Sequence, residues 1–485
     1  MKKNHIIFLF FVSFLFVTLF SRATSFLYVF EGADPSVFKQ MGLALLKGKL
    51  LYIDYFDNKG CLLYFLHALA LRLGGDLFLM LFQTISLFFT MLMWSGMLDL
   101  YHNARIRNLC LGITLVLLLG FYCSGDQSQE WCLPFITYPL LVYFKSYKTK
   151  KDIRPIQMLL IGVCVGIITF IQVNNACVVL GFYGFLWLHF LLKKEFRRFF
   201  TSLAYFILGW LLVASPCVMY FYLVSGWHGV YEMVYASFLS NLEYIGAGFH
   251  IRLFLFIPYV IMLLSLTILT WVNSRNEKEV LIPVLLSIVI FALTFGKLGN
   301  MYYLMAILPL FVITMMTFNF VEHKKLKRIG CGIMAVCLLY YLCDPMLHFG
   351  NDLLLRKEKE LVIYDQFHHC IEKIPENERD SIYNYNLYSI GTSMMHHESL
   401  LQSNRVLFTS LGFTLPTLKK EEAEKPFIPP KWILLTTDKY IEPNDAKYIE
   451  SNYVIAYSFQ YDKLYFPKPK IGELLQVYLL KRIEE

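Results

Sequence analysis

The sequence predicts a polytopic α-helical membrane protein with a soluble domain after its last span. Of the 485 residues, 57% are hydrophobic and only 16% are charged, and the mean hydropathy is +0.52. Soluble proteins carry a charge on about a quarter of their residues, so this composition excludes an ordinary soluble enzyme, a disordered chain and a coiled coil. The apolar residues also form long runs between short polar stretches, as in chains that cross a bilayer repeatedly.

About eleven apolar runs are candidates for transmembrane helices, since a helix needs about 20 residues to cross the hydrocarbon core. The third, fourth, fifth and last of them are short for this role. The first run follows Lys2 and Lys3 like a signal peptide, but no convincing cleavage site follows it, so we expect a retained helix. The predicted spans are 5–21, 77–100, 109–121, 130–144, 156–171, 176–192, 199–224, 253–272, 280–296, 301–320 and 329–343.

The distribution of basic residues predicts how these spans are oriented. Lys and Arg concentrate in alternate loops, such as 145–155 and 322–328, and a cytoplasmic N-terminus places those loops inside. The positive-inside rule therefore favours an N-in, C-out topology. The same distribution accounts for the formal net charge of +8 without a nucleic-acid partner, because the cations lie in turns and not on one face.

One apolar segment, residues 61–71, is too short to cross the bilayer and is followed by Arg72. If it were a span, every later loop would change sides and the basic clusters would lie outside. We therefore expect it to lie along the outer interface as a helix. This assignment leaves a long outer loop over residues 22–76.

Within this outer loop, residues 35–47 have the pattern of a short amphipathic helix. Phe38 and Met41 share one face, and Lys39 and Lys47 lie off it. Such a helix is expected to lie on the membrane surface, with its apolar face toward the lipid.

The composition changes after the last predicted span. Residues 1–343 form the predicted transmembrane domain, and residues 344–485 are polar, rich in tyrosine and mixed in charge, as in a soluble outer domain. Segments 431–435 and 453–457 have the pattern of strands, and 354–373 has that of a helix. The second domain is therefore predicted to be α+β and extracytoplasmic.

The first outer loop holds the residues that are the strongest candidates for catalysis or binding. Four carboxylates gather there, at a membrane boundary where no span requires them: Glu31, Asp34, Asp54 and Asp57. An alternative for Asp34 is a structural role, because Asp followed by Pro35 is a common helix N-cap. Asp54 and Asp57 have the alternative of being solvated loop carboxylates.

The loop carries Asp34, a short helix that ends near Gly48, a segment from Tyr52 to Lys59, and then an apolar helix. This order of parts resembles the first outer loop of bacterial GT-C glycosyltransferases. These are integral-membrane enzymes that use polyprenyl-phosphate sugars, and they include the dolichyl-phosphate-mannose mannosyltransferase-like and aminoarabinose transferase families. The resemblance extends more loosely to the many spans and the outer soluble domain.

The resemblance implies roles for individual residues. It implies that Asp34 is the catalytic base or the carboxylate that orients the acceptor, and that Lys59 binds the donor phosphate. Tyr52, Asp54 and Asp57 are implied to bind substrate. The family often has a proline after this lysine, and its absence here leaves the local backbone undecided.

A further acidic residue, Glu130, lies at the membrane mouth of the fourth predicted span, and the family has an acidic residue in a similar place. The resemblance thus implies that Glu130 binds substrate, with a solvated turn as the alternative.

The metal dependence stays open at this stage. Some relatives hold a divalent ion near the first-loop carboxylates, and Asp34 with Asp54 offers oxygen ligands for one. The pairs 368–369 and 396–397 are adjacent histidines, a spacing that does not favour a shared ion on a helix, so no metal is expected in the outer domain.

The leading hypothesis is a glycosyltransferase, a hexosyl- or pentosyltransferase that inverts the anomeric centre. It moves a sugar from polyprenyl phosphate to a lipid, glycan or protein acceptor on the outer face of a bacterial inner membrane. One alternative is a transporter or flippase of lipid-linked sugars, but transporters place ionisable residues near the midplane, and here they gather at one surface. Another is an O-antigen-type ligase or polymerase, which would rely on outer-loop residues such as His250 and Arg252.

Overall fold

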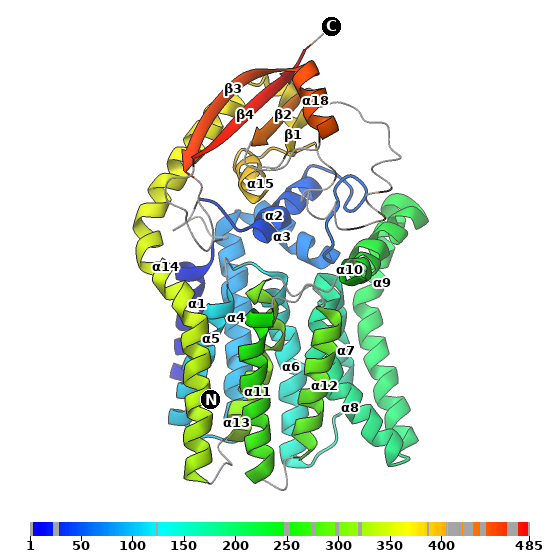
Figure 1. The fold of residues 1–485 in the computed structure, drawn as a ribbon. Coiled ribbons are helices and arrows are strands. Elements are labelled where there is room, and N and C mark those ends of the chain that lie inside the picture. The colour runs from blue at the N-terminus through cyan, green and yellow to red at the C-terminus, as the bar shows by residue number, and fades with distance from the viewer. Residues whose placement is uncertain are drawn as a thin grey trace. The chain divides into compact units, whose positions relative to one another are not determined.

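Figure 1 shows the computed structural model of the protein, which is mostly helical. It describes residues 3–22, 29–122, 125–246, 253–273, 278–295, 300–318, 323–385, 388–403, 405, 415, 417, 420, 430–436, 443–462 and 474–483. The chain divides into two compact units. We name them the helical unit, made of Met1–Ser21, Asn58–Leu63 and Met80–Met346, and the mixed unit, made of Arg22–Asp57, Tyr64–Leu79 and Leu347–Glu485.

The helical unit is built from long apolar helices with short connections, and a helix lies at each predicted span. Its elements are α1 (Lys3–Phe20), α4 (Asp76–Leu98), α5 (Ala104–Tyr122), α6 (Ser128–Thr149), α7 (Pro155–Gln172), η1 (Val173–Ala176), α8 (Cys177–Leu192), α9 (Phe196–Val234), η2 (Tyr235–Leu239), α10 (Ser240–Gly246), α11 (Leu253–Asn273), α12 (Lys278–Thr294), η3 (Met301–Ile307), α13 (Leu308–Phe318) and the first part of α14 (Lys324–Glu372).

Six helical stretches of the described chain are long and apolar enough to cross a membrane. They are Lys3–Phe20, Asp76–Leu98, Ala104–Tyr122, Pro155–Leu192, Phe196–Glu243 and Met301–Phe318. This finding fits a multi-pass membrane protein. The count of about eleven spans and the N-in, C-out orientation stay predictions.

One predicted boundary is wrong. The sequence predicts a span at 329–343 and a separate helix at 354–373, but α14 continues through both segments. Pro345 and Gly350 lie between them and favour a break. A proline removes only one backbone hydrogen bond, however, and the strongly helical segments on both sides carry the helix through.

Glycines allow helices α7 and α9 to approach each other closely. A Cβ atom built on Gly162 would lie 2.0 Å from the carbonyl oxygen of Phe206, and one on Gly209 would lie 2.0 Å from that of Leu159. Small residues at such crossings are the usual means of packing helices in a membrane, where the hydrophobic effect between helices is weak.

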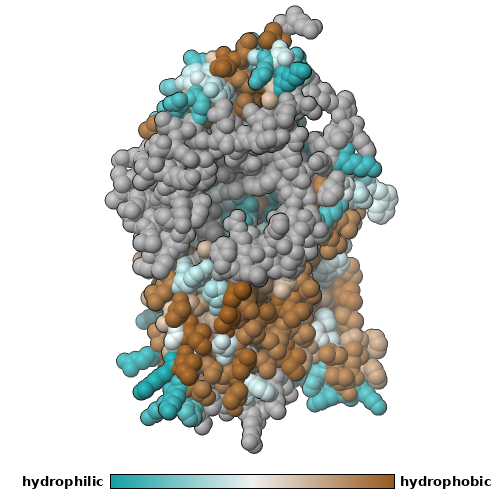
Figure 2. Space-filling view, viewed as in Figure 1, coloured by the Kyte–Doolittle hydropathy of each residue, from teal (hydrophilic) through white to brown (hydrophobic). Residues whose placement is uncertain are grey.

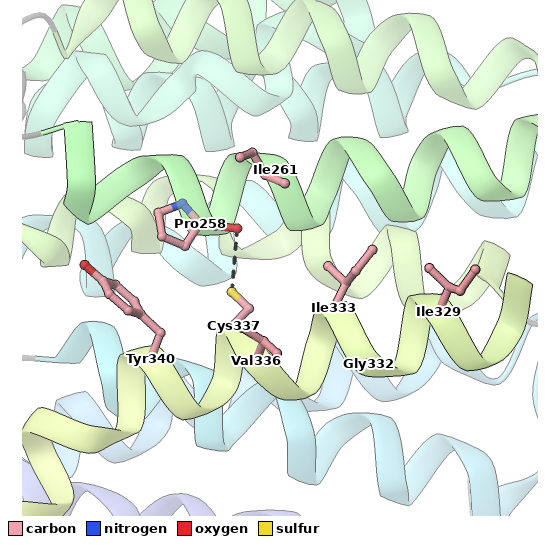
Figure 3. Close-up of a pocket in the computed structure, with 8 residues that line it drawn as sticks. All are labelled: Pro258, Ile261, Ile329, Gly332, Ile333, Val336, Cys337 and Tyr340. Carbon is pink, nitrogen blue, oxygen red and sulfur yellow. Dashed lines mark hydrogen bonds between the residues drawn. The ribbon is translucent and has the colours of Figure 1, made fainter.

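The outward face of the helical unit is apolar. Over the helices of this unit, most of the described surface in Figure 2 is hydrophobic, and exposed residues of α11, α12 and α14 include Ile261, Leu293 and Val336. An apolar groove of about 520 Å³ runs between α11 and α14. Its lining residues, shown in Figure 3, are Pro258, Ile261, Ile329, Gly332, Ile333, Val336, Cys337 and Tyr340. A surface of this kind suits contact with lipid hydrocarbon.

The mixed unit contains a four-stranded sheet in the order β1-β2-β4-β3. Strand β1 (Ile382–Tyr385) pairs in parallel with β2 (Trp432–Thr436), whereas β4 (Leu474–Arg482) is antiparallel to both β2 and β3 (Tyr453–Asp462). Strands β2 and β3 occur where the sequence predicts strands. The helical elements of this unit are α2 (Ala33–Leu46), most of α3 (Cys61–Leu73), the end of α14, η4 (Glu376–Ser381), α15 (Tyr388–His397) and α18 (Pro443–Asn452).

The first outer loop contributes to the core of the mixed unit. Phe30 is buried among apolar residues of α14, α15 and the sheet, including Phe367, Met394 and Trp432. The backbone N–H groups of Val29 and Phe30 donate to the carboxylate of the fully buried Glu360, at 2.8 and 3.1 Å. Residues separated by about 330 positions therefore build one core.

The expected surface character of the helix at 35–47 is partly wrong. Helix α2 forms as expected and buries Phe38 and Met41, but Lys39 is also completely buried. The ammonium group of Lys39 pairs with two carboxylates from outside the helix. These partners replace the solvent that a buried lysine would otherwise require. Residues 61–71 form a helix, α3, as expected, and its position along the interface stays a prediction.

Candidate functional site

Asp34 lies in the first turn of α2, and its side chain is partly exposed. The N-cap of this helix is Gly32, two residues earlier, so the interpretation of Asp34 as the cap is wrong. A carboxylate in the first turn of a helix interacts favourably with the positive end of the helix dipole.

The segment after α2 forms a tight turn around Tyr52 and Asp54. Tyr52 has a φ of +68°, an uncommon conformation for a residue with a side chain. Its N–H donates to the carbonyl oxygen of Tyr55 at 2.6 Å, and the carboxylate of Asp54 accepts the N–H of Leu50 at 2.8 Å. Asp54 is exposed, as the alternative of a solvated loop carboxylate predicts, and it closes the turn. Its contact with substrate stays a prediction.

Asp57 is buried, in contrast to the solvated alternative for it. The hydroxyl group of Tyr64 donates to its carboxylate at 2.7 Å, and the ring of Tyr64 packs edge-on against that of Tyr52. The sequence did not indicate Tyr64, because it falls within an apolar helix. A buried carboxylate with a tyrosine donor is held in one orientation, which is useful for positioning substrate.

Arg405, from the C-terminal part of the mixed unit, stabilises the turn around Tyr52 and Asp54. Arg405 donates to the carbonyl oxygens of Ile53 and Tyr52 at 3.0 and 3.1 Å, and its own carbonyl oxygen accepts the N–H of Phe56. The guanidinium group thus satisfies carbonyls of the strained turn. Nothing in the sequence pattern pairs Arg405 with a turn some 350 positions earlier.

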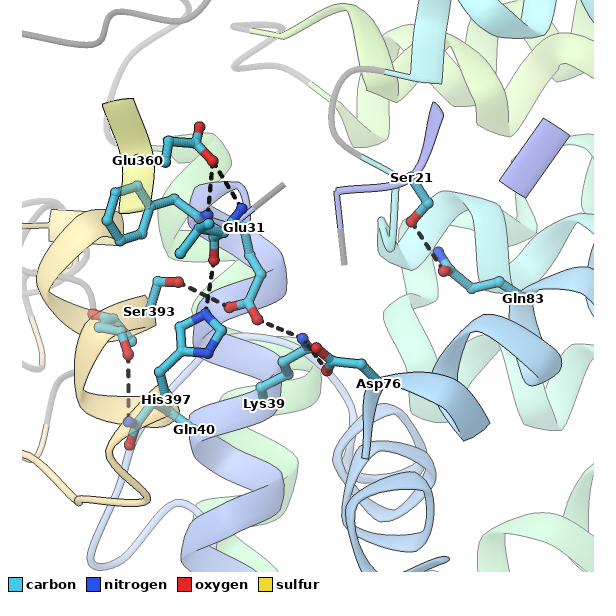
Figure 4. A network of polar contacts seen from close by, with 12 residues as sticks. Ser21, Glu31, Lys39, Gln40, Asp76, Gln83, Glu360, Ser393 and His397 are labelled. Carbon is cyan, nitrogen blue, oxygen red and sulfur yellow. Dashed lines mark hydrogen bonds and ion pairs between the residues drawn. The ribbon is translucent and has the colours of Figure 1, made fainter. Parts of the chain in front are cut away.

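A buried ion cluster lies beside α2, as Figure 4 shows. The ammonium group of Lys39 contacts the carboxylate of Glu31 and lies 2.5 Å from a carboxylate oxygen of Asp76. Burial alone would lower the pKa of Lys39, but the two carboxylates more than offset this effect and raise it. Lys39 is therefore charged at every physiological pH.

Helix α15 completes this cluster. The hydroxyl group of Ser393 donates to Glu31 at 3.3 Å, and His397 hydrogen-bonds the carbonyl oxygen of Val29 at 2.7 Å. Burial lowers the pKa of His396 to about 4, so its imidazole is neutral near pH 7. The cluster joins the first outer loop to the C-terminal part of the mixed unit.

Glu130 belongs to the helical unit, where it is buried, so the solvated-turn alternative is wrong. Its carboxylate accepts three donors: the hydroxyl group of Tyr122 at 2.8 Å, the N–H of Asp126 at 2.7 Å and the amide of Gln83 at 3.3 Å. Ser21 donates in turn to Gln83 at 3.0 Å, as Figure 4 shows. A buried carboxylate held by neutral donors retains affinity for a cation or a hydroxyl group.

Lys59 also belongs to the helical unit. Its ammonium group donates to the side-chain carbonyl of Asn58 at 2.8 Å, and the amide of Asn241 donates to the backbone carbonyl of Asn58 at 3.2 Å. The next residue, Gly60, donates its N–H to the carbonyl oxygen of Ile171 at 2.8 Å. The lysine is thus fixed against the end of α7 by a glycine contact, in place of the proline that the family often has.

Gly60 leaves no space for a side chain. Its Cβ atom would lie 2.2 Å from the carbonyl oxygen of Phe170, so we expect Gly60→Ala to lower the stability of the helical unit by about 1–3 kcal/mol. Thermal unfolding in detergent measures this change. Gly112→Ala is the control, because nothing lies within 4 Å of its Cβ position; an equal loss in both variants would contradict the tight contact.

The structure divides the predicted site residues between the two units. Asp34, Tyr52, Asp54 and Asp57 belong to the mixed unit, and Lys59 belongs with Glu130 to the helical unit. His250 and Arg252, on which the ligase alternative depends, lie outside the described residues.

The fold is shared with a protein of solved structure. It is similar to the crystal structure of ArnT from Cupriavidus metallidurans bound to undecaprenyl phosphate, with a TM-score of 0.59 over 99% of this chain and 98% of that chain. The sequences are 11% identical, so the similarity is one of fold, and at that level it confirms the resemblance found in the sequence. The chain belongs to the family described as the putative competence-induced protein Ccs4 N-terminal domain, which matches residues 1–330. No curated protein matches the chain.

Proposed function

We propose that this protein is a glycosyltransferase that uses a polyprenyl-phosphate sugar as its donor. The observation that carries the proposal is the ArnT-like fold over nearly the whole chain, since the ArnT structure contains undecaprenyl phosphate. The acidic residues of the first outer loop, together with Lys59 in the same loop, supply the residue types that this chemistry requires.

Lys59 is the residue proposed to bind the donor phosphate. Cleavage of the bond between the anomeric carbon and the phosphate oxygen leaves negative charge on the phosphate. A fixed cation stabilises this charge more in the transition state than in the ground state. The contacts of Asn58 and Gly60 fix the segment that carries Lys59, so little reorganisation is needed during reaction.

Asp34 is the residue proposed to act on the acceptor. A carboxylate within hydrogen-bond reach accepts the proton of the acceptor hydroxyl group as its oxygen attacks the anomeric carbon. Attack opposite the departing phosphate inverts the anomeric centre, and the product keeps one new glycosidic bond. Tyr52, Asp57 and Glu130 are proposed to position the sugar or the acceptor.

The remaining parts of the proposal concern place and partners. The acceptor is a lipid, glycan or protein on the outer face of a bacterial inner membrane, where the soluble domain at 344–485 would bind or orient it. A divalent ion at Asp34 and Asp54 is a further proposal; Asp54 is exposed, although one of its carboxylate oxygens already accepts a backbone N–H. Hexosyl and pentosyl donors are both candidates.

The experiment that tests the function is transfer of labelled sugar from a panel of polyprenyl-phosphate donors. The purified protein is incubated with membrane-lipid, glycan and protein fractions, and each fraction is counted. Label that moves into one fraction supports the enzyme and identifies the acceptor class. If the protein in lipid vesicles moves the donor across the bilayer without hydrolysis or transfer, the flippase alternative would replace the glycosyltransferase proposal.

A lysine variant tests the donor phosphate contact. We expect Lys59→Ala to lower kcat by roughly 100- to 1,000-fold, as for loss of one group that stabilises transition-state charge. Lys59→Arg keeps the charge and should retain part of the activity. Lys47→Ala, at an exposed ion pair with Asp380, is the control; equal activity of Lys59→Ala and this control would remove Lys59 from the site.

A further inference from the structure

Three possible metal ligands meet in the mixed unit beside α2. A carboxylate oxygen of Glu31, a carboxylate oxygen of Asp76 and a ring nitrogen of His396 all lie within 4.8 Å of one another. They come from the segment before α2, the start of α4 and the end of α15. Ligand atoms that bind one zinc ion lie about 2.0–2.2 Å from it, so only small shifts are needed for all three to reach a shared ion.

His396 provides a second, independent observation. Its Nδ1 atom is buried and has no hydrogen-bond partner among the residues that the structure describes. The neighbouring histidine, His397, is already hydrogen-bonded to Val29. A buried nitrogen without a partner requires an explanation, and an ion bound at that nitrogen is one.

The charges of the cluster also favour a further cation. Glu31 and Asp76 contribute two negative charges, and Lys39 contributes one positive charge, which leaves one negative charge uncompensated in a buried place. Burial of an uncompensated charge is costly. Once the ammonium group of Lys39 has withdrawn, a divalent cation on the two carboxylates would balance both of them.

We propose that Glu31, Asp76 and His396 bind a divalent cation with the preferences of zinc, in competition with the ammonium group of Lys39. Zinc binds both imidazole nitrogen and carboxylate oxygen, whereas magnesium and calcium prefer oxygen ligands throughout. Lys39 now contacts the carboxylate oxygens that the ion would use, so binding requires its ammonium group to withdraw from them. No covalent bond changes in this exchange.

This site differs from both metal sites considered from the sequence. The adjacency of His396 and His397 argued against a metal there, since two neighbouring side chains cannot easily face one ion. In the structure a ring nitrogen of His396 lies with two carboxylates, and these come from the first outer loop and α4. The proposed ligands are therefore one histidine and two carboxylates, and His397 is not among them.

The test measures zinc alone, without donor or acceptor. The full-length protein in detergent is stripped with a chelator, titrated with Zn²⁺ and analysed for bound metal. We expect one zinc per chain, at least tenfold weaker binding in His396→Ala, and unchanged binding in the control His368→Ala, whose exposed imidazole pairs with Glu398. Mg²⁺ should compete poorly.

A lysine variant tests the competition itself. Lys39→Met should bind zinc more tightly than the wild type, and zinc should raise its unfolding temperature more. Absence of stoichiometric zinc from the wild type, or equal affinity in His396→Ala and wild type, would overturn the site. Weaker binding in Lys39→Met would overturn the competition. If that variant does not fold, the two histidine variants still decide the site, and none of these outcomes depends on transferase activity.

Discussion

Asp34→Asn is expected to lower sugar transfer by roughly 100- to 10,000-fold, the range that a positioned general base contributes. The amide has nearly the same shape as the carboxylate but cannot accept the acceptor proton. Asp34 is partly exposed and is not the helix cap, so the substitution should leave the free energy of unfolding almost unchanged. The measurement is initial rate with labelled donor at saturating acceptor, together with thermal unfolding.

The matched control for Asp34→Asn is Asp380→Asn. Asp380 is an exposed carboxylate of the same unit, and its ion pair with Lys47 at 3.3 Å contributes little to stability. Full activity in the control and loss in Asp34→Asn would support the base. Full activity in both variants would end that assignment, and a lower unfolding temperature in Asp34→Asn alone would indicate a structural role instead.

Lys39→Met is expected to destabilise the mixed unit by about 3–5 kcal/mol, because it leaves Glu31 and Asp76 as buried charges without their cation. For a unit of this size the loss corresponds to a fall in the unfolding temperature of about 10 °C. Thermal unfolding of the metal-free protein in detergent measures it. Methionine has a volume close to that of lysine, so packing should change little.

The control for Lys39→Met is Lys47→Met on the same helix. Lys47 is partly exposed, and its loss should cost less than about 1 kcal/mol. The combined substitution of Lys39 by Met and Glu31 by Gln should recover part of the stability, because it removes one of the two unpaired charges. Similar unfolding temperatures in the two lysine variants would contradict a buried ion cluster.

Much of the fold could be predicted from the sequence because its signals are local. A helix lies at each of the eleven apolar runs, since hydrophobic length and period are properties of consecutive residues. The separation of 329–343 from 354–373 failed because Pro345 and Gly350 are only statistical signals of a break. Strands β1 and β4 were missed: β1 has only four residues, and the mostly apolar β4 does not alternate apolar with polar residues.

The candidate site was less predictable because it depends on distant contacts. The sequence selected Asp34, Asp57 and Glu130 as unusual residues, and the latter two are buried with specific donors. It could not identify Arg405 or Tyr64, whose roles arise only when separate segments meet. Lys39 was placed outside the apolar face for the same reason, since its two carboxylate partners lie outside the helix.

The shared core of the mixed unit has a consequence for how the protein is made. Phe30 packs against α14, α15 and the sheet, which a ribosome completes more than 300 residues later. Contacts of such sequence separation form slowly and only once both partners exist. The apolar residues of the loop that carries Asp34 therefore cannot pack into this core until synthesis is nearly finished. A prematurely terminated chain would have its helical unit and no completed loop.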